Sequence, residues 1–165
     1  MDLLEAYKLL YKDSKHVPIL EIIGDGPQEN MLINWVKENN LTQSINFRGR
    51  ITDESILIKY FQNALACISP KQAGLSVIKS LGYGVPFITS KYPITGGEYT
   101  AIIEGATGFF YDGSVENLKE VILNNVIENE NLDDNFISCY EYYRRFRSPK
   151  LWVENFIKAI HYTLK

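Results

Sequence analysis

Apolar and polar residues divide this chain into two kinds of segment. Short, continuously apolar runs are typical of buried parallel strands, and we expect them at 17–23, 44–47, 65–68, 85–89 and 107–113. Longer segments place apolar residues three or four positions apart, which predicts amphipathic helices, at 2–12, 28–39, 54–63, 75–83, 115–125, 136–147 and 149–164. Strands that alternate with helices predict an α/β protein with a parallel sheet. The polar, acidic stretch 128–135 is predicted to be a loop.

The clearest local signals lie in the run 65–90, which is read as strand, loop, helix, turn and strand. Pro70 ends the first strand, and Gly84 followed by Pro86 ends the helix. In a parallel α/β unit the intervening loop lies at the carboxyl edge of the sheet, where ligands bind. The Gly74 backbone and the first N–H groups of the helix can therefore face an anion.

Two further loops offer the same chemistry. The turn 24–27, Gly-Asp-Gly-Pro, follows a predicted strand, and its glycines permit close backbone approach to a ligand. The segment 96–98, Gly-Gly-Glu, precedes a short predicted helix. Glu98 is either a polar contact to a ligand or a carboxylate that complements the helix dipole. Arg48 is interpreted as a solvated arginine, whereas for Arg50 both this and a phosphate contact stay open.

Composition narrows the class of protein. The chain has 165 residues, 45% hydrophobic and 22% charged, with a net charge of -3, which gives no indication of nucleic-acid binding. No apolar run approaches the roughly 20 residues of a membrane span. Two cysteines, read as reduced thiols, and two distant histidines support neither a metal site nor a Ser-His-Asp set. A cytoplasmic globular protein is expected.

The motifs Ser69-Pro70, Gly74-Leu75 and Gly84-Val85-Pro86 resemble the donor-binding signature of the GT4 family of retaining glycosyltransferases, which have the GT-B fold. Lys71 and Lys79 stand where that family has two glutamates. The sequence looks like a subset of the family with a shortened loop and a G-L-S-V-type helix start. The resemblance implies a Rossmann-like, three-layer α/β/α domain, the carboxyl-terminal half of a GT-B fold.

The same resemblance implies a function. The protein would transfer a sugar, with retention and without metal, from a nucleotide-diphosphate sugar to a saccharide or lipid-linked acceptor in polysaccharide biosynthesis. The donor, a UDP- or GDP-sugar, is a substrate, no cofactor is implied, and the catalytic residues stay unknown. The residues expected to bind the donor are Gly24, Asp25, Gly26, Arg50, Pro70, Lys71, Gly74, Leu75, Ser76, Lys79, Gly96, Gly97 and Glu98.

In the GT4 family, the helix that corresponds to 2–12 follows a strand and a loop whose Arg and Lys bind the donor diphosphate. Neither residue is present before this helix in the sequence. We therefore expect residues 1–165 to be a single donor-binding domain of a longer enzyme, with 136–165 as its carboxyl-terminal helices. The first strand and the amino-terminal acceptor domain would be absent, and the isolated chain would be inactive. The missing domain is an expected partner. The basic cluster 144–150 is either a solvated helix face or a peripheral contact with the inner face of a membrane.

Three alternatives stay open. A sugar-nucleotide epimerase of the same fold would need a histidine and acid/base carboxylates in its cleft, and neither histidine falls in the candidate loops. A non-catalytic nucleotide-sugar-binding module is compatible with both glutamate replacements. An interaction domain of the response-regulator type should show no thermal shift with UDP or GDP.

Overall fold

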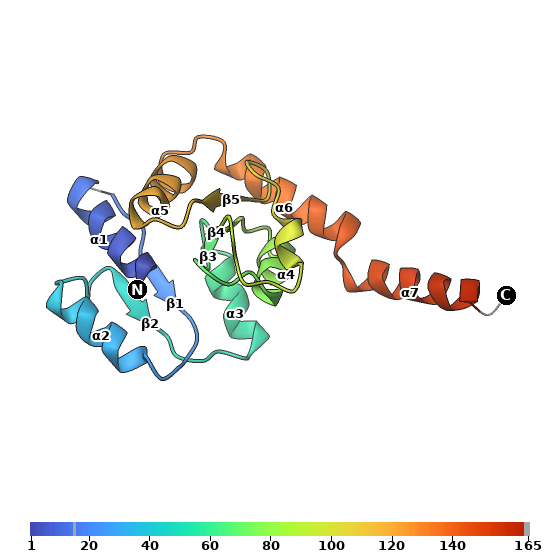
Figure 1. The fold of residues 1–165 in the computed structure, drawn as a ribbon, viewed down its shortest axis with the longest axis horizontal. Helices are drawn as coiled ribbons and strands as arrows, with labels where there is room; N and C mark the ends of the chain where they lie inside the picture. The colour runs from blue at the N-terminus through green and yellow to red at the C-terminus, as the bar shows by residue number, and fades with distance from the viewer. Residues whose placement is uncertain (15, 164–165) are drawn as a thin grey trace. The chain divides into compact units, whose positions relative to one another are not determined.

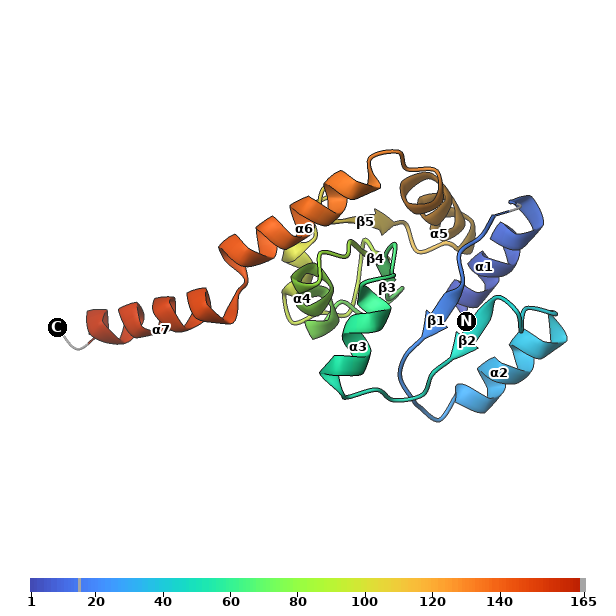
Figure 2. The same cartoon turned by 180° about the vertical axis from the view of Figure 1, so that it is seen from behind.

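The computed structural model describes residues 1–14 and 16–163, and Figures 1 and 2 show its fold from two sides. The chain forms two compact units, which are described separately. The first comprises residues 1–63 and 111–129, and the second comprises residues 64–110 and the chain from 130 onward.

The first unit contains one pair of parallel strands. β1 (Leu20–Ile22) pairs with β2 (Ile45–Phe47), with Leu20 opposite Ile45. The remaining elements are the helices α1 (Asp2–Asp13), α2 (Glu29–Glu38), α3 (Glu54–Phe61) and α5 (Val115–Ile122) and the π-helical turn η2 (Leu123–Ile127). α1 packs against α5. Their apolar faces supply the fully buried side chains Leu10, Leu118 and Ile122.

The second unit contains a sheet with the strand order β3 (Cys67–Ile68), β4 (Phe87–Ser90) and β5 (Gly108–Tyr111, of which 108–110 belong to this unit). β3 and β4 are parallel, with Cys67 opposite Phe87. The remaining elements are the helix α4 (Leu75–Gly82), the 3₁₀ helix η1 (Glu98–Ala101) and the helices α6 (Leu132–Phe146) and α7 (Pro149–Thr163). In both views α7 projects away from the rest of this unit.

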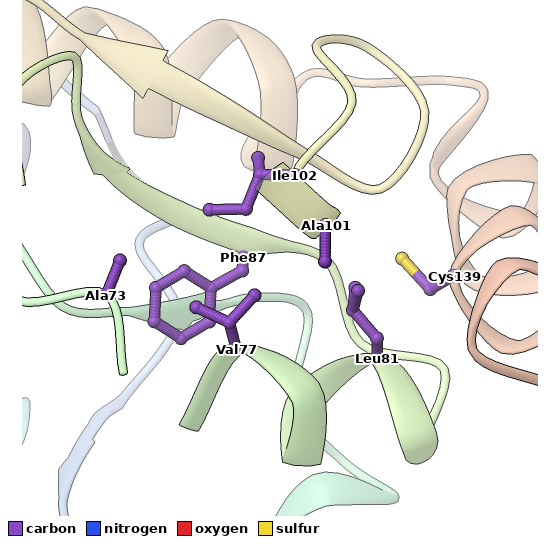
Figure 3. Packing of buried hydrophobic residues seen from close by; sticks show 7 residues of the cluster. All are labelled: Ala73, Val77, Leu81, Phe87, Ala101, Ile102 and Cys139. Carbon is purple, nitrogen blue, oxygen red and sulfur yellow. The ribbon is translucent and has the colours of Figure 1, made fainter. Parts of the chain in front are cut away.

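The core of the second unit fixes α4 against the sheet. Figure 3 shows Val77 and Leu81 of α4 meeting Phe87 of β4, Ala101 of η1 and Cys139 of α6, each fully buried. Burying one large apolar side chain contributes about 1.5–3 kcal/mol. This shared core therefore packs α4, which follows β3, and η1, which follows β4, against the sheet.

Close backbone contact joins β4 to β5. Phe87 N donates to Thr107 O at 3.1 Å. A Cβ atom at Gly108 would lie 2.0 Å from Phe87 O, so only glycine fits this position. β5 can therefore pack beside β4 without displacing the core residue Phe87.

The predicted fold class is confirmed as α/β with parallel strands. β1 and β3 belong to different sheets, since the described strands form a two-stranded and a three-stranded sheet. Two parts of the predicted fold stay predictions. One is the additional first strand that the family resemblance implies, and the other is the three-layer arrangement, which involves both units. The chain forms two compact units, and its expected organisation as a single donor-binding domain stays a prediction.

Several predicted boundaries need correction. The strands are shorter than the apolar runs, because each run extends into the turn beside it; β3, for example, covers only Cys67–Ile68. The loop predicted at 128–135 is wrong in its second half, since α6 begins at Leu132. Asn135, in that polar stretch, is buried because its Nδ2 donates to Gly105 O at 2.7 Å and Ala106 O at 3.2 Å. Leu164, the last predicted residue of the final helix, lies outside the described residues.

Candidate functional site

The candidate site in the second unit begins with the loop between β3 and α4. Backbone hydrogen bonds join this loop to the end of β4 and to the segment after it: Ser90 N donates to Pro70 O (3.0 Å), and Ile94 N donates to Lys71 O (2.8 Å). Ala73 N donates in turn to Ile94 O (2.9 Å). These bonds continue the parallel pairing of β3 and β4 beyond both strands. Both loops therefore leave the carboxyl edge of the sheet as one braced structure.

Gly74 is the residue immediately before α4. A glycine brings no side chain to cap the helix, and a Cβ atom there would meet nothing within 4 Å. The first N–H groups of a helix have no intrahelical partners, and the helix dipole places partial positive charge there. The start of α4 is thus open to an anion from the side of Gly74.

The predicted donor-binding residues of α4 lie on its exposed face. Val77, Ser80 and Leu81 are buried against the unit, whereas Leu75, Ser76 and Lys79 are exposed. Leu75 is 78% exposed, and Lys79 lies one turn further along the same face. Lys71 is also exposed, in the loop itself. The predicted residues of this segment therefore share the accessible side of the loop and of α4.

The second loop, 95–98, is held by its own side chains. Thr95 Oγ1 accepts a hydrogen bond from Gly97 N at 3.0 Å. Glu98 Oε2 accepts from Gly96 N at 3.0 Å and from Thr95 Oγ1 at 3.3 Å. Gly97 has φ +118, a conformation that favours glycine. Glu98 is thus bound to the turn in this structure, and both of its predicted roles stay predictions.

The two loops of the second unit lie together, because Ile94 bonds to the first loop and directly precedes Thr95. Residues 70–76 and 96–98 therefore meet at one sheet edge, as the sequence predicts. The residues predicted in the first unit, Gly24, Asp25, Gly26 and Arg50, form a separate set. Their convergence with these loops stays a prediction.

In the first unit the Gly-Asp-Gly-Pro turn leaves the carboxyl end of β1. Gly24 has φ +139, and its N–H donates to Gly49 O at 2.8 Å. Gly24, Asp25 and Gly26 are exposed, as is Arg50, directly after Gly49. The turn and the segment after β2 are therefore joined in the same way as the two loops of the second unit.

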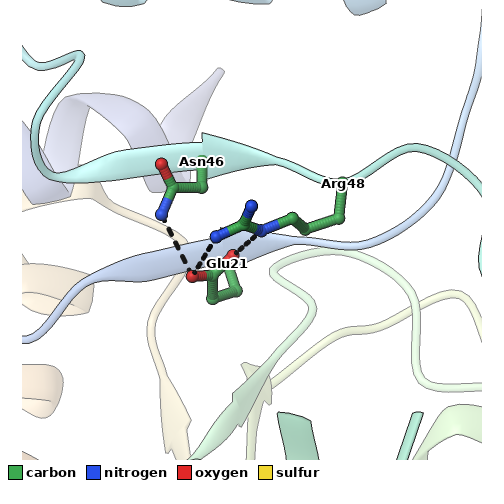
Figure 4. A network of polar contacts seen from close by, with 3 residues as sticks. All are labelled: Glu21, Asn46 and Arg48. Carbon is green, nitrogen blue, oxygen red and sulfur yellow. Dashed lines mark hydrogen bonds and ion pairs between the residues drawn. The ribbon is translucent and has the colours of Figure 1, made fainter. Parts of the chain in front are cut away.

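A polar network joins the side chains of β1 and β2 and the residue that follows β2 (Figure 4). Glu21 accepts from Arg48 Nε at 2.6 Å, from Arg48 Nη2 at 3.0 Å and from Asn46 Nδ2 at 3.0 Å. The hydrogen bond from Arg48 is the main cause that lowers the pKa of Glu21. Arg48 is therefore exposed, as the sequence interpretation expected, and in addition forms an ion pair with Glu21 of β1. The ion pair depends on the parallel register of β1 and β2, in which Glu21 lies opposite Asn46. The sequence pattern alone does not give this register.

The remaining reactive side chains are weak candidates for chemistry. Burial raises the pKa of the Cys67 thiol to about 11 and that of the Cys139 thiol to about 12, so both are protonated at neutral pH. His16 precedes β1, at the end opposite to the Gly24 turn, and His161 is exposed on α7. Within residues 1–14 and 16–163, no group of three His, Cys, Asp or Glu side chains is placed to hold a metal ion. None of the helices described there combines the length and apolar character needed to cross a membrane.

Sequence reasoning missed a set of polar residues that hold the second loop, namely Thr95, Thr100, Tyr142 and Arg147. Thr95 and Glu98 have the T-x-x-E spacing of a capping box, so this part was visible in the sequence. The Arg147 guanidinium donates from Nη2 to Thr100 Oγ1 at 3.1 Å across 47 positions. No local pattern predicts such a contact.

The comparison with protein families identifies the class. The model of the family described as glycosyl transferases group 1 matches residues 1–139. The chain belongs to this family, as the resemblance to GT4 enzymes predicted, and it has the fold of one half of a GT-B enzyme.

Solved structures share this fold at low sequence identity. The chain is similar to the pneumococcal O-GlcNAc transferase GtfA, solved with UDP and GlcNAc, with a TM-score of 0.79 and 19% identity over 99% of this chain and 33% of GtfA. It is similar to HepE from Anabaena, solved with UDP, with a TM-score of 0.77 and 13% identity over 97% of this chain and 44% of HepE.

Among curated proteins, Protein CapJ from Staphylococcus aureus is 30% identical over 74 residues, which are 43% of this chain and 19% of CapJ. The chain therefore spans less than half the length of each of these relatives.

Proposed function

We propose that this chain is the donor-binding part of a retaining, metal-independent glycosyltransferase that takes its sugar from a nucleotide-diphosphate donor. The observation that carries the proposal is the braced pair of loops in the second unit. The Gly74 side of α4 and the Gly96–Gly97 turn leave the same edge of a parallel sheet, and three backbone hydrogen bonds connect their segments. Family membership and the UDP seen in two structures of the same fold support this proposal.

The chemistry asked of these loops is to stabilise a leaving group. As the glycosidic bond to the diphosphate breaks, negative charge grows on the phosphate oxygens. Backbone N–H groups and a helix dipole that already point there stabilise this charge without reorganisation. We assign this role to Gly74, Leu75 and Ser76 at the start of α4. Gly96 and Gly97, whose N–H groups donate to Glu98 and Thr95, are proposed to border the donor at the same edge.

Lys71 and Lys79, which stand where the family has two glutamates, add positive charge beside the proposed diphosphate position. Lys79 lies one turn beyond Leu75 on the exposed face of α4, and we propose that it contacts a phosphate or the ribose. Lys71 and Pro70 border the same loop, and Lys71 is assigned to the diphosphate. In the first unit, the turn 24–26 and Arg50 are assigned to the nucleotide.

The rest of the enzyme is part of the same proposal. We infer that the acceptor, a saccharide or a lipid-linked saccharide, is bound by an amino-terminal domain absent from this chain, and that the chain alone does not turn over. The exposed apolar side chains of α7, including Trp152 and Phe156, fit such a covering domain. The basic segment 144–150 offers, through its exposed side chains, a peripheral contact with anionic lipid at the inner face of a membrane.

Calorimetric titration of the chain with UDP, GDP and dTDP and their sugars, with and without EDTA, tests donor binding. We expect one nucleotide to bind equally well in EDTA, and at a concentration 100 times its Kd to stabilise the fold by about 2.7 kcal/mol. Gly74→Val should weaken binding, because its side chain enters the space before α4, whereas Gly74→Ala is the milder control. Absence of binding by every nucleotide refutes the proposal, and binding that EDTA abolishes refutes metal independence.

A second candidate, a non-catalytic nucleotide-sugar-binding module, is favoured by one observation. Lysines stand at both positions where the family has glutamates. Sugar transfer by the protein that carries the amino-terminal domain decides between the two, because only the enzyme releases nucleoside diphosphate. An epimerase is disfavoured by the places of the two histidines, one before β1 and one on exposed α7.

A further inference from the structure

A hydrogen-bonded relay connects the end of α6 to the Gly96–Gly97 turn. Arg147 Nη2 donates to Thr100 Oγ1 at 3.1 Å, and Thr100 Oγ1 donates to Gly97 O at 2.8 Å. Thr100 N also donates to Gly97 O, at 3.1 Å. A hydroxyl group has one hydrogen to donate. Because Arg147 occupies the oxygen as a donor, the Thr100 hydrogen is directed to Gly97 O.

The relay fixes a peptide group that the turn needs. Gly97 is held on both sides, since Thr95 Oγ1 accepts from its N–H and Thr100 donates to its carbonyl. With φ +118, Gly97 lacks the steric restraint that a side chain would give it. Hydrogen bonds therefore set the orientation of the N–H groups that flank it.

Arg147 is itself held in place. Its Nη2 donates to the Tyr142 hydroxyl at 3.2 Å, and its guanidinium carbon lies 5.8 Å from the centre of the Tyr142 ring. Tyr142 packs against the core cluster of the second unit. Arg147 directly follows α6 and lies two residues before α7 begins at Pro149. The turn is thus tied to the core through a side chain 50 residues away in the sequence.

We propose that Arg147 is a positioning residue for donor binding, acting through Thr100 to orient the Gly96–Gly97 turn toward the donor diphosphate. This inference rests on the proposed function. Arg147 does not need to touch the donor. The N–H groups of Gly96 and Gly97 donate to Glu98 and Thr95 within the turn. The contribution of Arg147 is therefore to fix the Gly97–Glu98 peptide group, whose carbonyl oxygen accepts from Thr100 and whose N–H is that of Glu98, in the orientation that favours a phosphate oxygen.

The test compares Arg147→Gln and Thr100→Val with two controls. Arg145→Gln removes the same charge from an exposed neighbouring residue, and Thr100→Ser keeps the hydroxyl. The readouts are the Kd for UDP and for GDP, by calorimetry, and the amide resonances of Gly96 and Gly97, by NMR of the free chain. Arg147→Gln and Thr100→Val should each weaken binding of the preferred nucleotide roughly tenfold. Both should also shift the Gly97 resonance.

The double variant distinguishes a relay from two separate effects. Residues in one hydrogen-bonded chain are not additive, so Arg147→Gln with Thr100→Val should bind no more weakly than Thr100→Val alone. Both controls should bind as the unaltered chain does. An Arg147→Gln protein with unchanged affinity, or with the same loss as Arg145→Gln, refutes the positioning role alone. Failure of the unaltered chain to bind UDP, GDP or dTDP refutes the donor site and the positioning role with it.

Discussion

Helices α6 and α7 follow one another, and each has 15 residues with an apolar stripe, but only α6 is packed. α6 lies against α4 and buries Asn135 and Cys139. α7 has no buried residue in its described length, and Trp152 and Phe156 remain 67% and 54% exposed while their rings stack on each other. The comparison shows that an amphipathic pattern identifies the face that needs covering, but not what covers it.

The two helices also differ in how their polar residues are used. On α6, Asn135 lies on the buried side and bonds to two backbone carbonyl groups of the second unit. On α7, Asn155 lies on the exposed surface. The same residue type therefore contributes to tertiary structure in one helix and not in the other, which makes matched substitutions informative.

The largest expected effect on the free energy of unfolding is the difference between a charge placed on the apolar face of α6 and one placed on that of α7. Cys139→Asp places a charge at a fully buried position in the core cluster and should lower the free energy of unfolding by about 4 kcal/mol or more, enough to unfold a marginally stable chain. Phe156→Asp should change it by less than about 0.5 kcal/mol. Urea denaturation followed by circular dichroism measures both. An equal loss in the two variants would mean that the α7 face is covered in solution.

The next effect compares the two asparagines. Asn135→Ala removes the donor to Gly105 O and Ala106 O, and should cost about 2 kcal/mol because the carbonyl groups stay buried. Asn155→Ala should be neutral or slightly stabilising, since alanine is the better helix former. Thermal unfolding of the two variants gives the difference. A neutral Asn135→Ala would show that water replaces the lost donor.

Local signals explain which parts of the fold could be predicted. The loops at 70–74 and 96–98 follow from prolines, glycines and helix starts, all within a few residues of each other. The start of α6 at Leu132 could not be predicted, because the acidic stretch before it has loop composition and Asn135 is buried through a contact 30 positions away. Composition carries no information about such a contact.

The same limit applies to the candidate site. Its glycines and lysines were predicted from the motif, whereas Arg147 and Thr100 were not, because their contact joins the end of α6 to η1. The ion pair of Arg48 was not predicted for a similar reason, since its partner Glu21 lies on another strand. Side chains that hold a loop from elsewhere in the fold become visible only with coordinates.

A smaller effect measures how closely α6 approaches α4. Gly84 has φ +79, and a Cβ atom there would lie 3.3 Å from Phe136 O. Gly84→Ala should cost about 1–2 kcal/mol, part from the backbone conformation and part from displacing α6. Gly113→Ala, at φ +105 with nothing within 4 Å, carries only the conformational part. Urea denaturation measures the loss of unfolding free energy in both variants. Equal losses would mean that α6 moves away from residue 84 at no energetic cost.

The smallest effect uses a thiol as a pH probe of the two helices. Burial raises the pKa of Cys139 to about 12, against about 8.5 in an unfolded chain. Its contribution to stability is therefore complete below pH about 8.5 and is lost as pH rises toward 12. Relative to Cys139→Ala, the unaltered chain should lose about 1 kcal/mol by pH 9.5. Adding Phe156→Cys to Cys139→Ala moves the thiol to exposed α7, and the loss should disappear. A loss that persisted there would show that α7 is buried in solution, and denaturation curves at pH 7.5 and 9.5 decide the matter.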